Sequence, residues 1–466
     1  MNTVLNVGLP LVAALLGALL LFRLVRYMRQ DRETRASIRQ AMRVRHGWDR
    51  LAKMTGLSVT DKSPTILAGM LAQKGQTPAP RVLVPRIKVT ADRYGVVVRA
   101  KCRPKVGLEE FQRSARYLAD AWQCTRVSVL PDGPGRVVIR GVRLDPLTVP
   151  TTHLPTGQPP QDISAWRLGM DEYAGQVVLS LSNVAGVCIA GLPGTGKTST
   201  LNRLVCDFGP SNAVQFAVAD GKASTSEEGD YADLRSRLFA FAGDDLSEAN
   251  ELFKRLVRLR RSRASAIRSV LGVKNMWHCG PSEIWPLTIL IIDEAHTYFR
   301  EYKGNDAETK QLAKLSAENA RLVEDLVKKG RSVGIMVILT TQKATGDAIP
   351  TFIRDVCALG LSFAQKTTDA AVAALGDDIR NWPDANPVNL QDPAYVGVAA
   401  MSLHGRAGFT RVRTPQVSDA DAARIAEATS HLTLDPAAFL DCYPGPIDWK
   451  PSFADDPDMT ADNDAA

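Results

Sequence analysis

The stretch VCIAGLPGTGKTSTLNRLV, residues 187–205, constrains the fold of this chain more than any other part of it. Glycines and a proline surround Lys197, directly after an apolar run and directly before a helical pattern. Residues 191–198 match GxxxxGK[ST] in the strand–loop–helix context that this pattern requires. Glycines free the backbone so that successive N–H groups can point at a phosphate, and a helix amino terminus adds its positive end. The stretch therefore predicts a nucleotide-binding loop.

This loop predicts both a nucleotide and a metal. We expect the Lys197 ammonium to reach the β and γ phosphates of ATP and the Thr198 hydroxyl to ligate Mg²⁺. ATP and Mg²⁺ are therefore the expected cofactors. The residues expected to contact them are Gly191, Leu192, Pro193, Gly194, Thr195, Gly196, Lys197, Thr198 and Ser199.

Two later apolar runs end in polar residues suited to hydrolysis. The run PLTILIIDEAH ends its strand at Asp293 and Glu294, a carboxylate pair that is costly there unless it binds a cation or takes part in catalysis. We expect Asp293 to hold Mg²⁺ and Glu294 to orient or deprotonate the attacking water, which favours an ATPase over a GTP switch. The run GIMVILTTQ ends in Gln342, whose amide can touch the γ-phosphate and report hydrolysis.

The fold class follows from how apolar runs alternate with helical patterns after about residue 165. Uninterrupted apolar runs separated by helices are typical of a parallel sheet that is buried on both faces. We therefore expect an α/β domain with a mainly parallel sheet. The predicted strands are VVLSLS, AGVCIAG, AVQFAVAD, LTILIID, GIMVILTT and LGLSF.

The amino-terminal segment predicts a membrane anchor. Residues 4–25 are almost entirely apolar, which is long enough to span a bilayer core with Arg23 at its edge. The basic residues follow the apolar run and do not precede it, which argues against a cleaved signal peptide. They also place the rest of the chain in the cytoplasm. The alternative is a buried core helix. We expect a single-pass protein of a bacterial cell membrane.

The remaining sequence divides into segments with different patterns. Residues 26–84 read as a basic juxtamembrane helix and a linker, and residues 85–145 as a small α+β domain with two hairpins. A proline-rich linker, 146–164, leads to the ATPase domain, 165–430. The last segment, 431–466, ends in an acidic tail that is expected to be disordered. The seven cysteines form no CxxC pair, so neither a disulfide framework nor a zinc site is expected.

Three stretches resemble the motor domain of FtsK/SpoIIIE DNA translocases: IAGLPGTGKT, LTILIIDEAH and LVKKGRSVGIMVILTTQKATGDAIPTFIRD. The resemblance spans about residues 165–430 in consistent order, and the small α+β unit is also similar to the family's domain before the motor. It implies a RecA-like motor that assembles as a hexameric ring around double-stranded DNA. It also implies that Arg331 reaches a neighbouring subunit's nucleotide and that Gln342 is the sensor; the alternative for Arg331 is a surface arginine.

The sequence also departs from this family. An arginine that is usual in the strand after the sensor aligns near Gly360, so its contact is lost or moved, for example to Arg354. About 35 residues remain after the motor, too few for the family's winged-helix module. One anchor and one motor are closest in layout to TraB-type conjugative transfer ATPases.

We therefore expect a membrane-anchored, ATP-driven double-stranded DNA translocase, acting in DNA transfer or chromosome segregation. Lys222 and Lys343 are candidate DNA contacts, and the basic run 254–268 is interpreted as a solvated or subunit-facing helix surface. The alternative is a related ATPase that energises protein secretion, similar to type VII systems. A third possibility is a non-motor regulator that binds nucleotide without hydrolysing it, against which Asp293 and Glu294 argue.

Overall fold

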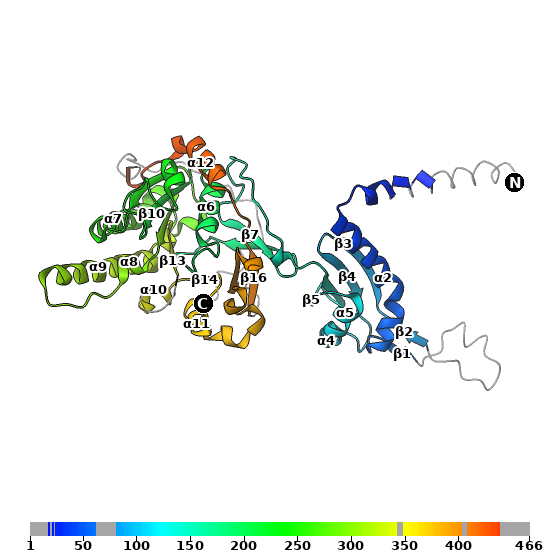
Figure 1. The fold of residues 1–466 in the computed structure, drawn as a ribbon. Helices are drawn as coiled ribbons and strands as arrows, with labels where there is room; N and C mark the ends of the chain where they lie inside the picture. The colour runs from blue at the N-terminus through cyan, green and yellow to red at the C-terminus, as the bar shows by residue number, and fades with distance from the viewer. Residues whose placement is uncertain are drawn as a thin grey trace, which may run out of the picture. The chain divides into compact units, whose positions relative to one another are not determined.

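The computed structural model describes residues 17–18, 21–22, 24–61, 81–342, 348–402 and 408–438. The chain forms two compact units, the first extending to Pro146 and including Glu172–Gly175, and the second comprising the other residues from Leu147 onward. Both are shown in Figure 1.

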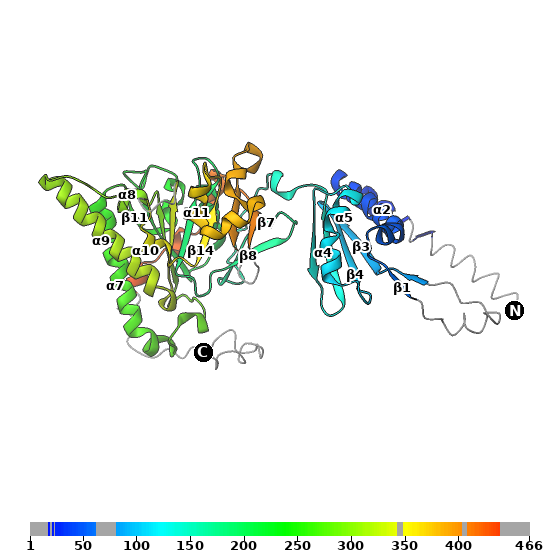
Figure 2. The same cartoon turned by 90° about the horizontal axis from the view of Figure 1, so that it is seen from below.

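The first unit is a four-stranded antiparallel sheet with helices on one face. Its sheet order is β3-β4-β6-β5, and β1 pairs separately with β2. The side chains of one sheet face pack against α2, α4 and α5 in a single hydrophobic core, and α2 and α5 lie beside the sheet in Figure 2. The elements are α2 (Arg32–Met54), β1 (Val59–Asp61), β2 (Arg81–Leu83), β3 (Arg86–Asp92), β4 (Gly95–Lys101), α4 (Leu108–Arg113), α5 (Ala115–Trp122), β5 (Arg126–Pro131) and β6 (Arg136–Val142).

Helix α2 belongs to the core of this unit. The indole ring of Trp48 is stacked on Phe111 and tilted against Trp122, with both centroid separations 6.4 Å. Its Nε1–H donates to the Pro85 carbonyl at 2.7 Å. The sequence pattern correctly indicated an amphipathic helix here, but the unit is wider than the expected 85–145, because the apolar face of α2 is buried against the sheet.

The two expected hairpins are present, and the helical segment between them is divided at Ser114 into α4 and α5. Strands β3 and β4 pair directly, as do β5 and β6 around the DGPG turn. Ser114 ends α4 and precedes α5, and its buried hydroxyl donates to the Thr55 carbonyl.

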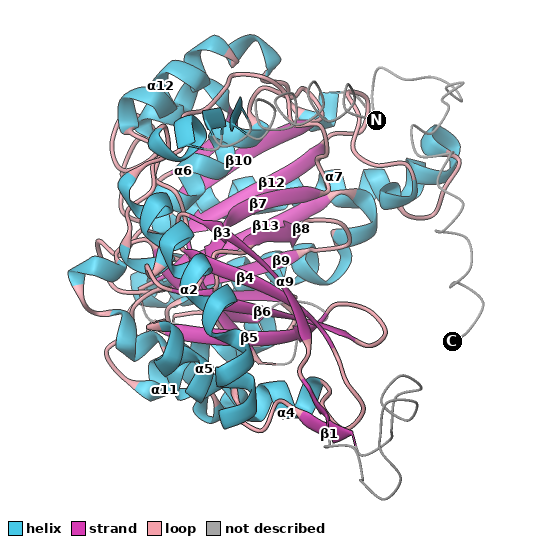
Figure 3. Cartoon of the chain, turned by 90° about the vertical axis from the view of Figure 1, so that its right-hand side faces the viewer, coloured by secondary structure: helices cyan, strands magenta, loops and turns pink. Residues whose placement is uncertain are grey.

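The second unit contains a ten-stranded sheet of order β11-β10-β12-β13-β9-β14-β15-β16-β7-β8. In the sheet order, the strands from β11 through β10, β12, β13 and β9 to β14 pair in parallel, and the rest pair antiparallel. Figure 3 shows β10 and β12 side by side. The expected mainly parallel α/β fold is confirmed. The strands are β7 (Ala165–Asp171), β8 (Gln176–Ser180), β9 (Gly186–Ala190), β10 (Val214–Asp220), β11 (Leu238–Ala242), β12 (Leu287–Asp293), β13 (Ile335–Thr341), β14 (Leu359–Ser362), β15 (Val398–Ser402) and β16 (Phe409–Arg413).

Helices cover both faces of this sheet. On one face, Leu201 and Leu204 of α6 lie beside Val187 and Ile189 of β9. On the other face, Val327 of α9 packs beside Gly186 of the same strand. Burial on both faces explains why the strands are continuous apolar runs. The helices are α6 (Lys197–Phe208), α7 (Leu246–Leu271), α8 (His296–Phe299), α9 (Ala307–Lys329), α10 (Thr351–Arg354), α11 (Thr368–Leu375) and α12 (Asp419–Ala428).

Part of the expected proline-rich linker, 146–164, is built into the second unit. Thr152 forms a parallel bridge with Gln416, and backbone hydrogen bonds join the two segments on either side of it. Leu147 is fully buried. The segment therefore packs as part of the ATPase domain.

The expected membrane helix, 4–25, lies largely outside the described residues, as does most of the carboxyl-terminal segment after residue 438. Within the described part of the chain, no helix combines the length and the apolar character needed to cross a bilayer.

Replacing Trp48 by alanine should destabilise the first unit by about 3–5 kcal/mol, because a buried indole and its hydrogen bond are lost. Differential scanning calorimetry of the full chain should show one transition lowered and the transition of the ATPase unit unchanged. Met42→Ala, an exposed position on the same helix, is the control. An unchanged thermogram for Trp48→Ala would show that α2 is not part of this core.

Candidate active site

The predicted nucleotide loop connects β9, which ends at Ala190, to α6, which begins at Lys197. Gly194 and Gly196 have φ values of 72° and 112°, in the region that favours glycine. A Cβ atom at Gly196 would also lie 3.0 Å from the Gly397 Cα atom. Thr195 closes the turn by donating its hydroxyl to the Leu192 carbonyl at 2.7 Å. Backbone geometry and packing therefore both require glycine here.

Lys197 is buried at the start of α6. Its ammonium donates to the Gly191 carbonyl at 2.6 Å and to the Leu192 carbonyl at 3.0 Å. Burial, together with the positive charge of Lys222, lowers the pKa of Lys197, and Asp293 and Glu294 oppose this shift. The expected P-loop lysine and the expected acidic pair therefore share one electrostatic environment.

Asp293 is the last residue of β12 and is 1% exposed. Its Oδ1 accepts hydrogen bonds from the Thr340 hydroxyl and from the Glu294 backbone N–H. Glu294 has a φ of 48°, a left-handed conformation that costs a residue with a side chain about 1–3 kcal/mol. Strain of this kind is concentrated at functional sites, so its position next to a buried carboxylate supports a catalytic role.

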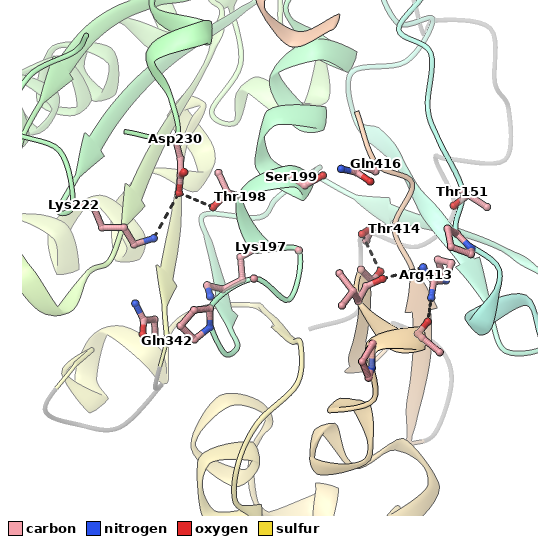
Figure 4. Close-up of a pocket in the computed structure, with 18 residues that line it drawn as sticks. Thr151, Lys197, Thr198, Ser199, Lys222, Asp230, Gln342, Arg413, Thr414 and Gln416 are labelled. Carbon is pink, nitrogen blue, oxygen red and sulfur yellow. Dashed lines mark hydrogen bonds and ion pairs between the residues drawn. The ribbon is translucent and has the colours of Figure 1, made fainter. Parts of the chain in front are cut away.

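Lys222, in the loop after β10, completes the charged cluster. Its ammonium lies 3.2 Å from Asp293 Oδ2, 4.0 Å from Glu294 Oε2 and 3.9 Å from Asp230 Oδ2. Asp230 in turn accepts a hydrogen bond from the Thr198 hydroxyl at 3.2 Å (Figure 4). The structure therefore links the two expected metal ligands, Thr198 and Asp293, through Lys222 and Asp230. It places Lys222 among carboxylates, which does not support its interpretation as a DNA contact.

Neighbouring strands bring a further carboxylate to this edge. Asp220 is the register partner of Asp293 in the parallel pair β10–β12 and is fully buried. Burial, with the nearby Asp293 charge, raises the pKa of Asp220 to about 6, against the opposing effect of Lys222. Sequence reasoning missed Asp220 and Asp230, although Asp220 ends an apolar run just as Asp293 does.

The cluster fits a bound Mg²⁺ in charge and in ligand type. Hydroxyl and carboxylate oxygens are the donors that Mg²⁺ prefers, and it needs few protein ligands because phosphates and water supply the rest. Glu294 Oε2 is buried without a hydrogen bond. Among the described residues no group of three or more His, Cys, Asp or Glu forms a metal site. Thr198 and Asp293, which Asp230 and Lys222 link in this cluster, are the residues that would hold the ion together with the nucleotide.

A cavity of about 590 Å³ opens beside the loop. Figure 4 shows its lining from α6, the 222–230 loop, the end of β13 and the segments around residues 151, 396 and 414. Of the residues predicted from sequence, it is lined by Pro193, Gly194, Gly196, Lys197, Thr198, Ser199 and Gln342. The part formed by Thr151, Val396 and Gln416 was not foreseen, because these residues carry no motif and meet only through the fold.

Arg331 lies at the other end of β13 from this cavity. Its side chain is exposed, on a 3-10 turn (Arg331–Val333) that precedes β13, whereas Gln342 follows that strand. The seven residues of β13 span about 23 Å at about 3.3 Å per residue. Arg331 therefore does not reach the nucleotide cavity of its own subunit.

Buried hydrogen bonds hold the Arg331 turn in place. The guanidinium of Arg263 on α7 donates to the carbonyls of Val333, Gly334 and Pro286, and Trp277 donates to the Arg331 carbonyl. Arg263 is 1% exposed, and burial lowers its pKa to about 9. The interpretation of the basic run 254–268 as a solvated or subunit-facing helix surface is thus wrong for Arg263.

Gly360 of β14, where the resembled family has an arginine, is packed closely. A Cβ atom there would lie 2.9 Å from the Ala374 carbonyl oxygen of α11. In the sheet, Gly360 pairs with Cys188 of the neighbouring strand β9. The close approach of α11 accounts for the glycine.

Replacing Lys222 by glutamine should weaken nucleotide binding most when Mg²⁺ is absent. The cluster then carries one more uncompensated negative charge towards the triphosphate, so we expect the Kd for a fluorescent ATP analogue to rise by about tenfold in EDTA, equivalent to about 1.4 kcal/mol. Excess Mg²⁺ should reduce the effect by neutralising the same carboxylates. Lys328→Gln, on the exposed face of α9, is the control. Equal loss of affinity in both conditions would contradict this role.

Comparison with known proteins agrees with this geometry. Residues 187–358 match the family model described as ATPase family associated with various cellular activities (AAA). No curated protein matches the chain.

Solved structures of several nucleotide-driven proteins are similar in part. The pCW3 conjugation coupling protein TcpA with ATPγS shares 16% identity at a TM-score of 0.48, over 87% of this chain and 99% of that one. The type VII secretion ATPase EccC of Thermomonospora curvata shares 15% identity at a TM-score of 0.44, over 66% of this chain and 35% of that one. The genome packaging NTPase B204 of Sulfolobus turreted icosahedral virus 2 shares 14% identity at a TM-score of 0.29, over 51% of this chain and 100% of that one.

The family match covers the nucleotide loop, the acidic pair and Arg331. Over this region the chain therefore contains an AAA-type P-loop ATPase domain.

Proposed function

We propose that this protein is a membrane-anchored, ATP-driven double-stranded DNA translocase whose RecA-like motor domains assemble as a hexameric ring. In this proposal residues 4–25 anchor the chain in a bacterial cell membrane and the ATPase unit lies in the cytoplasm. Its role is DNA transfer, as in the TraB-type layout, or chromosome segregation.

The position of Arg331 carries the proposal. A motor that hydrolyses ATP needs a positive charge at the transferring phosphoryl group, and a guanidinium is suited to that task. Arg331 is rigidly presented but lies a strand length from its own cavity. A ring of identical subunits would bring it to the next subunit's nucleotide, because head-to-tail contacts of one kind close into rings.

In this proposal the predicted site residues have distinct parts in hydrolysis. The amide groups of the 191–196 turn and the Lys197 ammonium bind and orient the triphosphate. Mg²⁺, when bound, supplies charge neutralisation on the phosphates. Glu294 holds the attacking water and accepts its proton, and Gln342, at the end of β13, contacts the terminal phosphate and changes position when it leaves.

The net charge of +7 favours an anionic cargo. Duplex DNA gripped through its phosphates would be bound in a salt-sensitive and largely sequence-blind way. Lys343 remains a candidate contact, although it lies outside the described residues.

Long duplex DNA should stimulate ATP turnover by the purified full-length protein, with stimulation falling as salt is raised. Lys197→Ala should abolish turnover, because the triphosphate loses its ammonium. A steady-state phosphate-release assay with and without DNA measures both effects. Identical rates with and without duplex DNA across a range of salt concentrations would rule out the proposed DNA-motor function. The protein-secretion ATPase would then remain as the alternative.

Arg331→Ala should reduce turnover by about 10³-fold or more while nucleotide binding is retained, as for other arginines that act on a transferring phosphoryl group. Mixing Arg331→Ala with Glu294→Ala subunits should restore some turnover, because intact sites form where the two meet. Arg321→Ala, an exposed arginine of α9, is the control. Full activity of Arg331→Ala alone would end the assignment.

A further inference from the structure

The open face of the first unit's sheet carries an unusual concentration of positive charge. The opposite face packs Val96, Val98 and Ile139 against the helices. The open face also carries Arg140 of β6 and Arg126 of β5, which are half-buried and paired with Asp92 and Asp145. Its five exposed cations project from three adjacent strands, and we call these residues the basic sheet face. They are Arg86 and Lys88 on β3, Arg99 and Lys101 on β4, and Arg136 on β6.

The strand register places these cations directly opposite one another. Arg86 pairs with Lys101, and Lys101 pairs with Arg136, so three cations form one row across three strands. The next row on this face joins Lys88 to Arg99. Opposed side chains have Cβ atoms only about 4.5–5.5 Å apart. Rows on one face are about 6.6 Å apart, since side chains alternate between faces.

Few carboxylates compensate this charge. Asp132 lies 3.6 Å from Arg99, and Asp92 is engaged by Arg140 at 2.8 Å. Within the described part of the chain, no carboxylate forms an ion pair with Arg86, Lys88, Lys101 or Arg136 or accepts a hydrogen bond from them. All five cations of the face are exposed.

Like charges directly opposite in a sheet are destabilising, so folding alone does not account for three aligned cations. An anionic ligand that lies across the three strands would remove the repulsion and gain several charge-assisted contacts.

We propose that the basic sheet face binds the phosphate backbone of duplex DNA, as a second contact outside the motor. This inference takes its ligand from the proposed function. The face presents no exposed aromatic side chain, whereas single-strand binders stack bases on aromatic rings. It also lacks the large apolar side chains that insert into a membrane interface, apart from Leu130 at the edge. Phosphate contacts from a flat, cationic surface are sequence-blind.

The test compares two variants of the full-length protein with equal charge changes. The first is Arg86→Gln/Lys101→Gln/Arg136→Gln, which removes the aligned row. The control is Arg45→Gln/Arg50→Gln/Arg116→Gln, which removes three exposed cations from α2 and α5 on the helical side of the same unit. Binding of a fluorescent duplex is measured by anisotropy over a range of salt, with ATP-analogue binding and thermal unfolding as checks on the fold.

The row variant should bind duplex DNA at least about tenfold more weakly. The slope of log K against log salt concentration should decrease in magnitude by about 2 to 3, since each phosphate contact contributes about 0.9 to it. The control should resemble the unsubstituted protein. The row variant should bind the ATP analogue normally and unfold at an equal or higher temperature, because a like-charge row is removed.

Other outcomes separate this inference from the proposed function. If the unsubstituted protein does not bind duplex DNA, the proposed function itself fails. If it binds, but the row variant has the same affinity and salt slope, the motor is retained and the basic sheet face is not a DNA site. Unchanged DNA binding with lost binding to phosphatidylserine vesicles would assign the face to a membrane and overturn the inference.

Discussion

The account depends on the parallel pairing of β10, β12, β13 and β9, because parallel strands place all their carboxyl ends at one edge. This pairing brings the lysine that follows β9 near the carboxylate that ends β12, with Gln342 between them at the end of β13. It also puts Asp220 beside Asp293. A concentration of charge that would be unfavourable in an isolated strand suits a triphosphate and the cation that we propose for it. The same strand direction sends Arg331 to the opposite edge, away from its own nucleotide.

Charge balance explains why the cluster is stable before any ligand binds. Asp293 has both carboxylate oxygens engaged, one by Thr340 and a backbone N–H, the other by Lys222. Lys222 thus supplies positive charge where a divalent cation would otherwise be needed. A Mg²⁺ ion held by Asp293 would take over part of this charge neutralisation.

Sequence patterns were sufficient to predict where the residues of contiguous motifs lie, at the end of a strand or the start of a helix, while their roles stay predictions. Lys197, Thr198 and Asp293 belong to contiguous motifs whose flanking strands and helix are visible as apolar patterns. Lys222 and Asp230 were not assigned to the site because their role depends on which strands are neighbours, and no local pattern states that β10 lies next to β12. Trp48 shows the same limit, since periodicity predicted α2 but not its partners Phe111 and Trp122. Arg263 lay in a run that looked solvated, and only the packing of α7 on the Arg331 turn shows that it is buried.

The further inference adds a contact with the cargo in the first unit to those proposed for the motor, and the central claim concerns the nucleotide. The most direct test is an electron cryomicroscopy structure of the full-length protein with ATPγS, Mg²⁺ and duplex DNA. The account predicts a closed ring around the duplex in which the Arg331 guanidinium lies within hydrogen-bond distance of the γ-phosphate held by the neighbouring subunit's loop. A particle without such rings, or a ring in which Arg331 faces solvent with nucleotide bound, would contradict it.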